Sequence, residues 1–347
     1  MKEYSDSVDT RIIKIDPNNI DWKYLQLAGQ AIREGRLVAF PTETVYGLGA
    51  DALNAEAVLK IFQAKKRPFY DPLIVHIYNL EEIYDYVEFF PDVARTLGEL
   101  FWPGPLTMVL KKSKSISDIV TSGLDTVAIR IPDHKVALGL IKEARRPIAA
   151  PSANLFSHTS PTTAWHVISD LKGSIDIIID SGETLIGLES TVVDVTTSPL
   201  QILRLGGITF EILKKIIPDI IIADDHIKIK KAPGMLSRHY SPRAKLILVQ
   251  DKDEKMIEKI RKLALRHRNK GKKVGVIACQ ENREKYFGFI VKVLGEAKDL
   301  NSCARNLYAQ LRILDELKCD IIISENFEDM GIGRAIMDRL KRASRNC

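Results

Sequence analysis

Small hydrogen-bonding side chains follow two apolar runs that each end at a proline. Residues 37–41 (LVAFP) are followed by Thr42, and residues 147–151 (PIAAP) are followed by Ser152 and Asn154. Short apolar runs of this kind are typical of buried strands, and α/β sheets bind ligands beyond the ends of their strands. The repeated chemistry predicts that both strand ends line one pocket. For the first run taken alone, an ordinary strand-to-helix loop is the alternative interpretation.

A basic cluster, Lys65-Lys66-Arg67, stands where the helix expected over residues 54–64 is ended by Pro68. Cations at a helix C-terminus interact favourably with the helix dipole, so capping is one interpretation of the cluster. A phosphate clamp is the other interpretation, because two cations on one short segment can flank a polyphosphate.

Two further polar residues interrupt predicted strands. Arg130 lies in the alternating segment 126–132 (TVAIRIP) and shares a face with Thr126 and a small residue, which leaves room for an anion beside the guanidinium. His76 lies within residues 72–77 (PLIVHI), where a satisfied core histidine is the alternative to a ligand-binding one.

Composition limits the class of protein. At 347 residues the chain exceeds one comfortable core, so two domains are expected. The net charge of +6 suits the binding of anions such as nucleotides, but it is too small to indicate nucleic-acid binding alone. The four cysteines form no CxxC pair and lie near no histidine cluster, so no metal site is expected. A polar N-terminal segment and the lack of a long apolar run favour a cytoplasmic location without membrane association.

The order of the predicted elements indicates an α/β protein. Helical spacing over residues 20–34 and 54–64 alternates with strand-like segments in the first part of the chain, where Gly47 and Gly49 are expected to form a tight turn. From residue 244 onward, strands alternate with helices, which predicts a small, mostly parallel, doubly wound domain. The predicted division is therefore a catalytic domain, a linker and a C-terminal domain, over residues 1–217, 218–243 and 244–347.

Eight ordered blocks of the sequence closely resemble the YrdC-like threonylcarbamoyl-AMP synthases: PTETVYGLGADA, KKRP, PLIVHI, WPGPLT, TVAIRIP, PSAN, GLESTVVD and LRLGG. Two later segments, APGMLSRHYSP and GIGRAIMDRL, resemble the long two-domain form of that family. The resemblance spans nearly the whole chain. It implies a twisted mixed sheet with a concave nucleotide and threonine pocket, followed by a Rossmann-like parallel α/β domain.

The resemblance also implies an activity, that of a nucleotidyltransferase. L-threonine, bicarbonate and ATP would condense to L-threonylcarbamoyladenylate and pyrophosphate, the first step of the t6A modification at position 37 of tRNA. Mg²⁺ would be held mainly by the ATP phosphates, with no side-chain ligand indicated. The product would pass to tRNA or to a threonylcarbamoyl-transferase complex.

Residue roles follow from the same resemblance. Lys65 and Arg67 would act on the phosphates as catalytic residues. The expected ATP-binding residues are Lys65, Arg67, Thr126, Ser152, Asn154, Ser160, Arg204 and Tyr240, of which Tyr240 would close over the nucleotide as part of a lid. The expected L-threonine-binding residues are Thr42, His76, Arg130 and Ser190. The choice of Thr42 over Thr44 rests only on its being the first threonine of its block.

Two rival functions differ in class from this one. The first is a non-catalytic module that binds tRNA or double-stranded RNA, for which the basic helix face over residues 255–273 would be the contact surface; a solvated surface is the alternative interpretation of that face. The second is a carbamoyl-transfer domain, which would be expected to carry zinc-finger and acylphosphatase-like segments that this sequence lacks.

Overall fold

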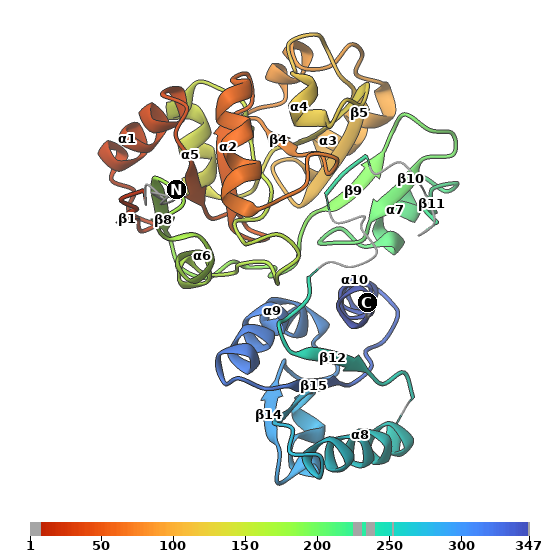
Figure 1. Cartoon of the computed structure of the whole chain (residues 1–347). Helices are drawn as coiled ribbons and strands as arrows, with labels where there is room; N and C mark the ends of the chain where they lie inside the picture. Colours follow the sequence, from red (N-terminus) through yellow and green to blue (C-terminus); the bar gives the residue numbers. More distant parts are fainter. Residues whose placement is uncertain (1–7, 225–230, 234–239, 252, 346–347) are drawn as a thin grey trace.

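The computed structural model describes residues 8–224, 231–233, 240–251 and 253–345. Two α/β units lie one above the other in Figure 1, each built on its own sheet. The larger sheet has eleven strands in the order β1-β8-β2-β3-β7-β4-β6-β5-β9-β10-β11, with parallel and antiparallel neighbours. The smaller sheet has the order β12-β15-β13-β14. The predicted α/β class, with a mixed sheet followed by a parallel one, is confirmed.

The strands of the larger sheet are short, and most are buried on both faces. Their bounds are β1 Arg11–Lys14, β2 Val38–Phe40, β3 Gly47–Asp51, β4 Ile74–His76, β5 Leu106–Lys111, β6 Thr126–Arg130, β7 Ile148–Ala149, β8 Ile177–Asp180, β9 Thr191–Asp194, β10 Gln201–Arg204 and β11 Ile221–Ile222. The last of these pairs with β10, so the larger sheet continues beyond residue 217.

Helices cover both faces of the larger sheet. Apolar residues of α1 (Trp22–Arg33) and α5 (Lys135–Ala144) form one core with β1, β2 and β8. Residues of five other helices form a second core on the opposite face, and these are α2 (Ala55–Lys65), α3 (Asp92–Phe101), α4 (Asp118–Thr121), α6 (Ala164–Leu171) and α7 (Phe210–Ile216). A short 3₁₀ helix, η1 (Glu81–Asp85), precedes α3.

Strand β3 brings the two polar strand ends together. It pairs antiparallel with β2 on one side and with β7 on the other. Gly47, at its start, lies opposite Phe40 and also forms an isolated bridge with Ser152. Because of this central strand, the loop after β2 and the loop after β7 lie beside each other although more than 100 residues separate them in the sequence.

The tight turn expected at Gly47 and Gly49 is wrong, because both glycines lie within β3. Packing across the sheet explains the second glycine. A Cβ atom on Gly49 would lie 2.7 Å from Ile148 Cγ2 and 2.8 Å from Phe40 Cε1, which is closer than real Cβ contacts. Gly49 thus lets β2 and β7 side chains approach the backbone of β3.

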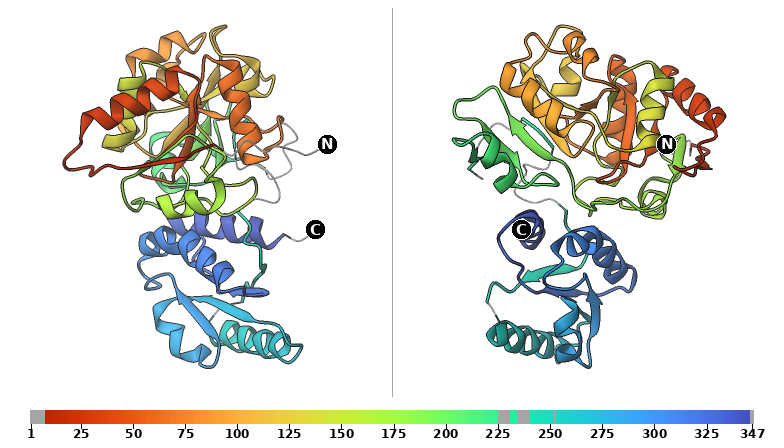
Figure 2. Two further views of the ribbon diagram at one scale, coloured as in Figure 1. Left: turned by 60° about the vertical axis from the view of Figure 1, so that its left-hand side comes forward. Right: turned by 180° about the vertical axis from the view of Figure 1, so that it is seen from behind.

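All four strands of the smaller sheet are parallel: β12 (Lys245–Leu248), β13 (Val274–Ala278), β14 (Ile290–Val293) and β15 (Ile321–Ser324). Helix α8 (Asp253–Arg268) packs on one face, with the 3₁₀ helix η2 (Gln280–Tyr286) beside it. Helices α9 (Leu300–Glu316) and α10 (Ile332–Ser344) pack on the other face. The views in Figures 1 and 2 agree that α9 and α10 are the elements of this unit nearest the larger one.

The two units share apolar packing. Val45 and Leu188 of the larger unit belong to the same buried cluster as Leu307, Tyr308 and other residues of α9 and α10. Polar contacts add to it: Arg305 Nε donates to the carbonyl of Leu185 at 2.8 Å. The C-terminal unit is therefore docked on the larger one through its α9–α10 face.

Candidate functional site

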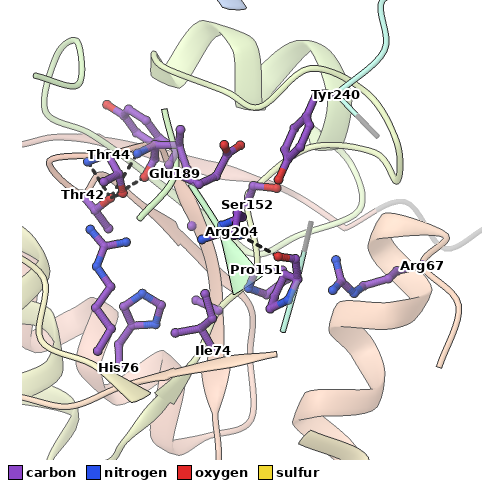
Figure 3. Close-up of a pocket in the computed structure, with 16 residues that line it drawn as sticks. Thr42, Thr44, Arg67, Ile74, His76, Pro151, Ser152, Glu189, Arg204 and Tyr240 are labelled. Atoms are coloured by element: carbon purple, nitrogen blue, oxygen red, sulfur yellow. Dashed lines mark hydrogen bonds between the residues drawn. The ribbon is translucent and has the colours of Figure 1, made fainter. Parts of the chain in front are cut away.

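A cavity opens where the loops after β2 and β7 meet (Figure 3). Its wall draws on β4, β6 and β10, on the loop before β9 and on Tyr240 from the segment before the smaller sheet. Among the described residues, three arginines and one carboxylate provide its charge. The lining residues are Thr42, Thr44, Val45, Tyr46, Gly47, Arg67, Ile74, His76, Arg130, Ala150, Pro151, Ser152, Glu189, Arg204, Pro233 and Tyr240.

The loop after β2 is held by the side chain of Thr42. Its hydroxyl donates to the carbonyl of Val45 at 2.6 Å and lies 2.8 Å from Thr44 Oγ1. It also accepts from the backbone N–H groups of Thr44 and Val45, both at 3.2 Å. These local bonds fold the loop back on itself, as serine and threonine side chains commonly do in turns. Both Thr42 and Thr44 line the cavity, so either one can be the residue that binds threonine.

Arg130 and His76 lie side by side because β4 and β6 are parallel neighbours with these two residues in register. Arg130 forms a buried ion pair with Glu43, at 2.6 Å from Nη2 to Oε1. Burial, with Arg130 as a second cause, lowers the pKa of His76 to about 3, so its ring is neutral at pH 7. Among the described residues, His76 Nδ1 has no hydrogen-bond partner. A buried ring atom without a partner is costly unless a ligand supplies one.

The basic cluster after α2 divides into two roles. Arg67 lines the cavity, pairs with Asp71 at 2.8 Å and donates to the carbonyl of Pro72 at 3.0 Å. Lys65 is 1% exposed, and its Nζ donates to the carbonyls of Ser152 and Asn154, both at 2.5 Å. Burial and the nearby Arg67 lower the pKa of Lys65 well below its usual range. In this structure, Lys65 holds the loop after β7 rather than lining the cavity.

Arg204 reaches the cavity from β10. Its Nε donates to the backbone carbonyl of Ser190 at 3.0 Å, and its Nη2 donates to the hydroxyl of the same residue at 3.0 Å. Nη1 donates to the carbonyl of Pro233 at 2.9 Å. Ser190 Oγ also lies 2.7 Å from Thr107 Oγ1. In the part of the chain that the structure describes, Arg204 therefore donates its hydrogen bonds to uncharged oxygen atoms.

Seven of the predicted site residues line the cavity: Thr42, Arg67, His76, Arg130, Ser152, Arg204 and Tyr240. The other five, Lys65, Thr126, Asn154, Ser160 and Ser190, are buried outside its lining. Of these, Lys65, Ser160 and Ser190 contact lining residues directly. The hydroxyl of Thr126 has no hydrogen-bond partner among the described residues. Most of the loop expected to act as a lid, residues 225–230 and 234–239, lies outside the described residues.

Sequence reasoning missed the carboxylates of the site. Glu189 lines the cavity itself, while Glu43 and Asp71 pair with its arginines. Glu43 and Glu189 stand within the quoted blocks PTETVYGLGADA and GLESTVVD, each next to a residue that was selected. That adjacency was the available signal. Two partners of Glu189, Tyr308 and Arg339, lie more than 100 residues away in the sequence, so no local pattern identifies them.

The described residues offer neither a cluster for a metal ion nor a membrane-spanning helix. No group of three or more His, Cys, Asp or Glu side chains in these segments is arranged to hold a metal ion. No helix within the same segments is long and apolar enough to cross a bilayer.

The chain matches two family models. Residues 30–206 match the Sua5/YciO/YrdC model, which is described as telomere recombination, and residues 208–345 match the model for the threonylcarbamoyl-AMP synthase C-terminal domain. A threonylcarbamoyl-AMP synthase of Pyrococcus abyssi is 46% identical over 96% of this chain and 98% of its own length. One from Bacillus subtilis is 45% identical over 91% of this chain and 92% of its own length.

A solved structure shows the same arrangement of both units. The crystal structure of P. abyssi Sua5 complexed with L-threonine superimposes with a TM-score of 0.92 at 45% identity, covering 96% of this chain and 97% of that one. The predicted resemblance is thereby confirmed. This chain belongs to the Sua5/YciO/YrdC family, in the form that carries the threonylcarbamoyl-AMP synthase C-terminal domain.

Proposed function

We propose that this chain synthesises L-threonylcarbamoyladenylate from L-threonine, bicarbonate and ATP, with release of pyrophosphate. The observation that carries the proposal is a cavity in which three arginines, Arg67, Arg130 and Arg204, converge with small hydroxyl groups. Relatives similar over both units are named for this activity, and one of them was crystallised with L-threonine. The reaction is a nucleotidyl transfer, which depends mostly on positioning and charge neutralisation.

The threonine side of the pocket is assigned to four residues. Arg130 pairs with the threonine carboxylate, and the neutral His76 uses its free Nδ1 to accept a hydrogen bond from the bound amino acid. Thr42 supplies the loop that closes this end, through its own hydroxyl or that of Thr44. Ser190 completes the set behind Arg204.

The nucleotide side is assigned to the cations and to the loop after β7. Arg67 and Arg204 face the phosphates. Lys65 has one of two roles: it holds the loop of Ser152 and Asn154 in place, or its side chain moves to contact the phosphates. The nucleoside end is assigned to Tyr240, which lines the cavity, and to Thr126 and Ser160, which are buried behind its wall. Tyr240 would be the fixed end of a lid. The described cavity has a volume of about 40 Å³, room for only a few water molecules. ATP would need more room than this cavity offers as described.

The chemistry joins two anions. The uncharged amine of threonine attacks carbon dioxide with loss of a proton, or bicarbonate with loss of water, to give a carbamate. A carbamate oxygen then attacks the α-phosphorus while pyrophosphate leaves. The arginines screen the repulsion between carbamate and triphosphate. Mg²⁺ held by the ATP phosphates would add to this screening. The one carboxylate that lines the cavity, Glu189, is already paired, which supports phosphate rather than side-chain ligands for the ion.

The wider assignment follows from the reaction. The product serves the t6A37 modification of tRNA in the cytoplasm, passing to tRNA or to a threonylcarbamoyl-transferase complex. We assign catalysis to the unit ending near residue 217, with residues 218–243 as linker and 244–347 as the C-terminal domain. The pairing of β11 with β10 supports extending the catalytic unit to Ile222.

Pyrophosphate release from ATP tests this function. We expect release only when L-threonine and bicarbonate are both present, and omission of either should bring the rate to the background level. ATP turnover that ignores threonine would contradict the proposal. Lack of turnover combined with tight binding of tRNA would favour the non-catalytic RNA-binding alternative.

A further inference from the structure

A buried carboxylate joins the cavity to the C-terminal unit. Glu189 is 5% exposed and lies on the cavity wall, just before β9. It accepts a hydrogen bond from Ser160 Oγ at 2.5 Å within its own unit. Its other partners come from the C-terminal unit: Arg339 Nε at 2.8 Å and the Tyr308 hydroxyl at 3.1 and 3.2 Å. A wall residue of the pocket is therefore held by residues 119 and 150 positions away in the sequence.

Arg339 does more than pair with Glu189. It is 1% exposed, its Nη2 donates to the carbonyl of Leu205 at 2.7 Å, and its Nη1 pairs with Asp338 at 2.5 Å. Its guanidinium lies 4.7 Å from the ring centroid of Tyr240, which stacks on Tyr308 at 5.8 Å. Arg339 thus contacts the carbonyl next to Arg204 and the aromatic ring that closes the cavity. Such a fixed fork of donors is a property of arginine that lysine does not share.

The charges explain why this contact matters for an anionic ligand. Burial raises the pKa of Glu189, but Arg339 and Arg204 outweigh it and hold the pKa at about 2, so the carboxylate is ionised at pH 7. An ionised carboxylate on the wall repels a polyphosphate and attracts Arg204. Arg339 balances that charge from outside the cavity, so Arg204 stays available to a ligand inside it.

We infer that Arg339 and Tyr308 are positioning residues for the nucleotide: the C-terminal unit completes the ATP pocket by neutralising and orienting Glu189 behind its wall. This inference rests on the proposed function of the cavity and adds a role for the second unit. We expect the effect at the nucleotide end, because Arg339 donates to the carbonyl of Leu205, next to Arg204, and Arg204 is one of the charges that lower the pKa of Glu189.

The test compares steady-state kinetics of Arg339→Met with those of the wild-type full chain. We expect the KM for ATP to rise at least tenfold, while the KM for L-threonine changes less than about threefold. Arg334→Met is the matched control, since Arg334 lies on the same helix and reaches Glu211 and Phe210 of the larger unit away from the cavity. That control should leave both KM values within about twofold of the wild type.

A second variant separates charge from packing. Adding Glu189→Gln to Arg339→Met removes the unbalanced carboxylate, so the KM for ATP should return to within about threefold of the wild-type value. The double variant also keeps the test available if Arg339→Met alone fails to fold, because it removes both members of the buried Arg339–Glu189 ion pair together. Thermal unfolding of all variants shows whether each is folded at the assay temperature.

Failure of this inference can be told apart from failure of the proposed function. Wild-type protein without threonine-dependent pyrophosphate release would contradict the function itself, whatever the variants do. With an active wild type, equal rises in the KM for both substrates, a fall in kcat alone, or a double variant no better than Arg339→Met would overturn the inference. Any of these would leave Arg339 as a docking residue only.

Discussion

At the scale of single residues, the cavity differs from a simple basic patch. Arg67 and Arg130 are each paired with a buried carboxylate, whereas the described bonds of Arg204 go to neutral oxygens. Exchanging a neutral oxygen for phosphate gains charge–charge attraction without leaving a carboxylate unpaired. Arg204 is therefore the arginine on which the binding of triphosphate should depend most directly.

Arg204→Met tests this view. We expect kcat/KM for ATP to fall by a factor of about 10² or more, because a buried cation that faces the reacting phosphates is lost. Arg36→Met, which removes a guanidinium exposed on the surface, is the control and should keep its wild-type kcat/KM. A loss of less than tenfold in Arg204→Met would show that the other two arginines suffice.

His76 predicts a pH dependence of stability. In the unfolded chain its pKa is near the ordinary value of 6.5, but in the fold it is about 3, so protons bind the unfolded state preferentially between these values. The contribution of His76 to the free energy of unfolding is present above pH 6.5. It is lost by about 1.4 kcal/mol per pH unit as the pH falls toward 3.

His76→Gln should remove this dependence. Denaturant unfolding at pH 7, 6 and 5 is expected to show a shallower decline for the variant than for the wild type, by about 1.4 kcal/mol per pH unit below 6.5. His134 and His166, whose pKa values burial also lowers, are common to both proteins and cancel in the difference. Parallel curves for the two proteins would show that His76 already binds protons in the fold.

At the scale of elements, strand β3 is the part that makes one site out of two distant loops. Gly47 and Gly49 lie on the same face of this strand but differ in how closely other side chains pack against them. A Cβ on Gly49 would be 2.7 Å from its nearest neighbour, whereas one on Gly47 would be 3.4 Å away. Neither residue is among those with positive φ, so the difference is one of packing and not of backbone strain.

Gly49→Ala should therefore destabilise the fold by about 1–3 kcal/mol, the usual cost of overpacking. Gly47→Ala is the matched control, and a cost below about 1 kcal/mol is expected because its neighbours stand at ordinary contact distance. Urea unfolding of the two variants measures both values. An equal loss of free energy of unfolding in the two variants would mean that the side chains of β2 and β7 can move to make room for the added methyl group.

Much of this fold was predictable because it rests on local patterns. The apolar run of β2, that of β7 and the helical spacing of α1 are each formed by residues that are close together in the sequence. The pairing of β3 between β2 and β7 was not predictable, because glycines allow both a turn and a strand and only distant side chains decide. The same limit hid Glu189, whose ionisation depends on Arg339 of the other unit.

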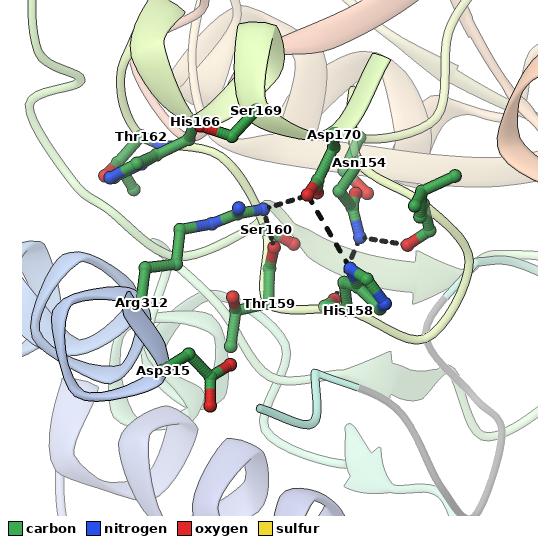
Figure 4. Close-up of polar contacts among 12 residues, drawn as sticks. Asn154, His158, Thr159, Ser160, Thr162, His166, Ser169, Asp170, Arg312 and Asp315 are labelled. Atoms are coloured by element: carbon green, nitrogen blue, oxygen red, sulfur yellow. Dashed lines mark hydrogen bonds and ion pairs between the residues drawn. The ribbon is translucent and has the colours of Figure 1, made fainter. Parts of the chain in front are cut away.

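At the scale of the whole molecule, docking of the two units depends on close backbone approach as well as on charge. Arg312 of α9 pairs with Asp170 of α6 at 2.8 Å, and Asp170 also lies 3.6 Å from His158 Nδ1 (Figure 4). Burial raises the pKa of Asp170, but the bonds from His158 and Arg312 outweigh it and hold the pKa below its usual range. Elsewhere, Gly187 approaches the backbone of Arg305 so closely that a Cβ would lie 2.4 Å from its Cα.

Gly187→Ala should loosen this docking. Gly187 and Gly182 share one loop and have φ values of +77° and +84°, so alanine costs about 1–2 kcal/mol of backbone strain at either. Only at 187 would the methyl group meet the other unit, since nothing lies within 4 Å of a Cβ on Gly182. We expect a larger radius of gyration by small-angle X-ray scattering and a weaker affinity for ATP in Gly187→Ala than in Gly182→Ala. If both variants gave the same scattering curve, a small local shift would be enough to relieve the clash at residue 187, and the docking of the two units would not depend on this glycine.

The ion pair between Arg130 and Glu43 has a consequence for selectivity among small solutes. The two side chains are 5% and 4% exposed, so either one left alone is a buried, uncompensated charge. A simple anion such as chloride or phosphate that draws Arg130 away leaves Glu43 in that state. A zwitterion brings an ammonium group together with its carboxylate and can satisfy both partners at once. We therefore expect the pair to favour zwitterionic amino acids over simple inorganic anions.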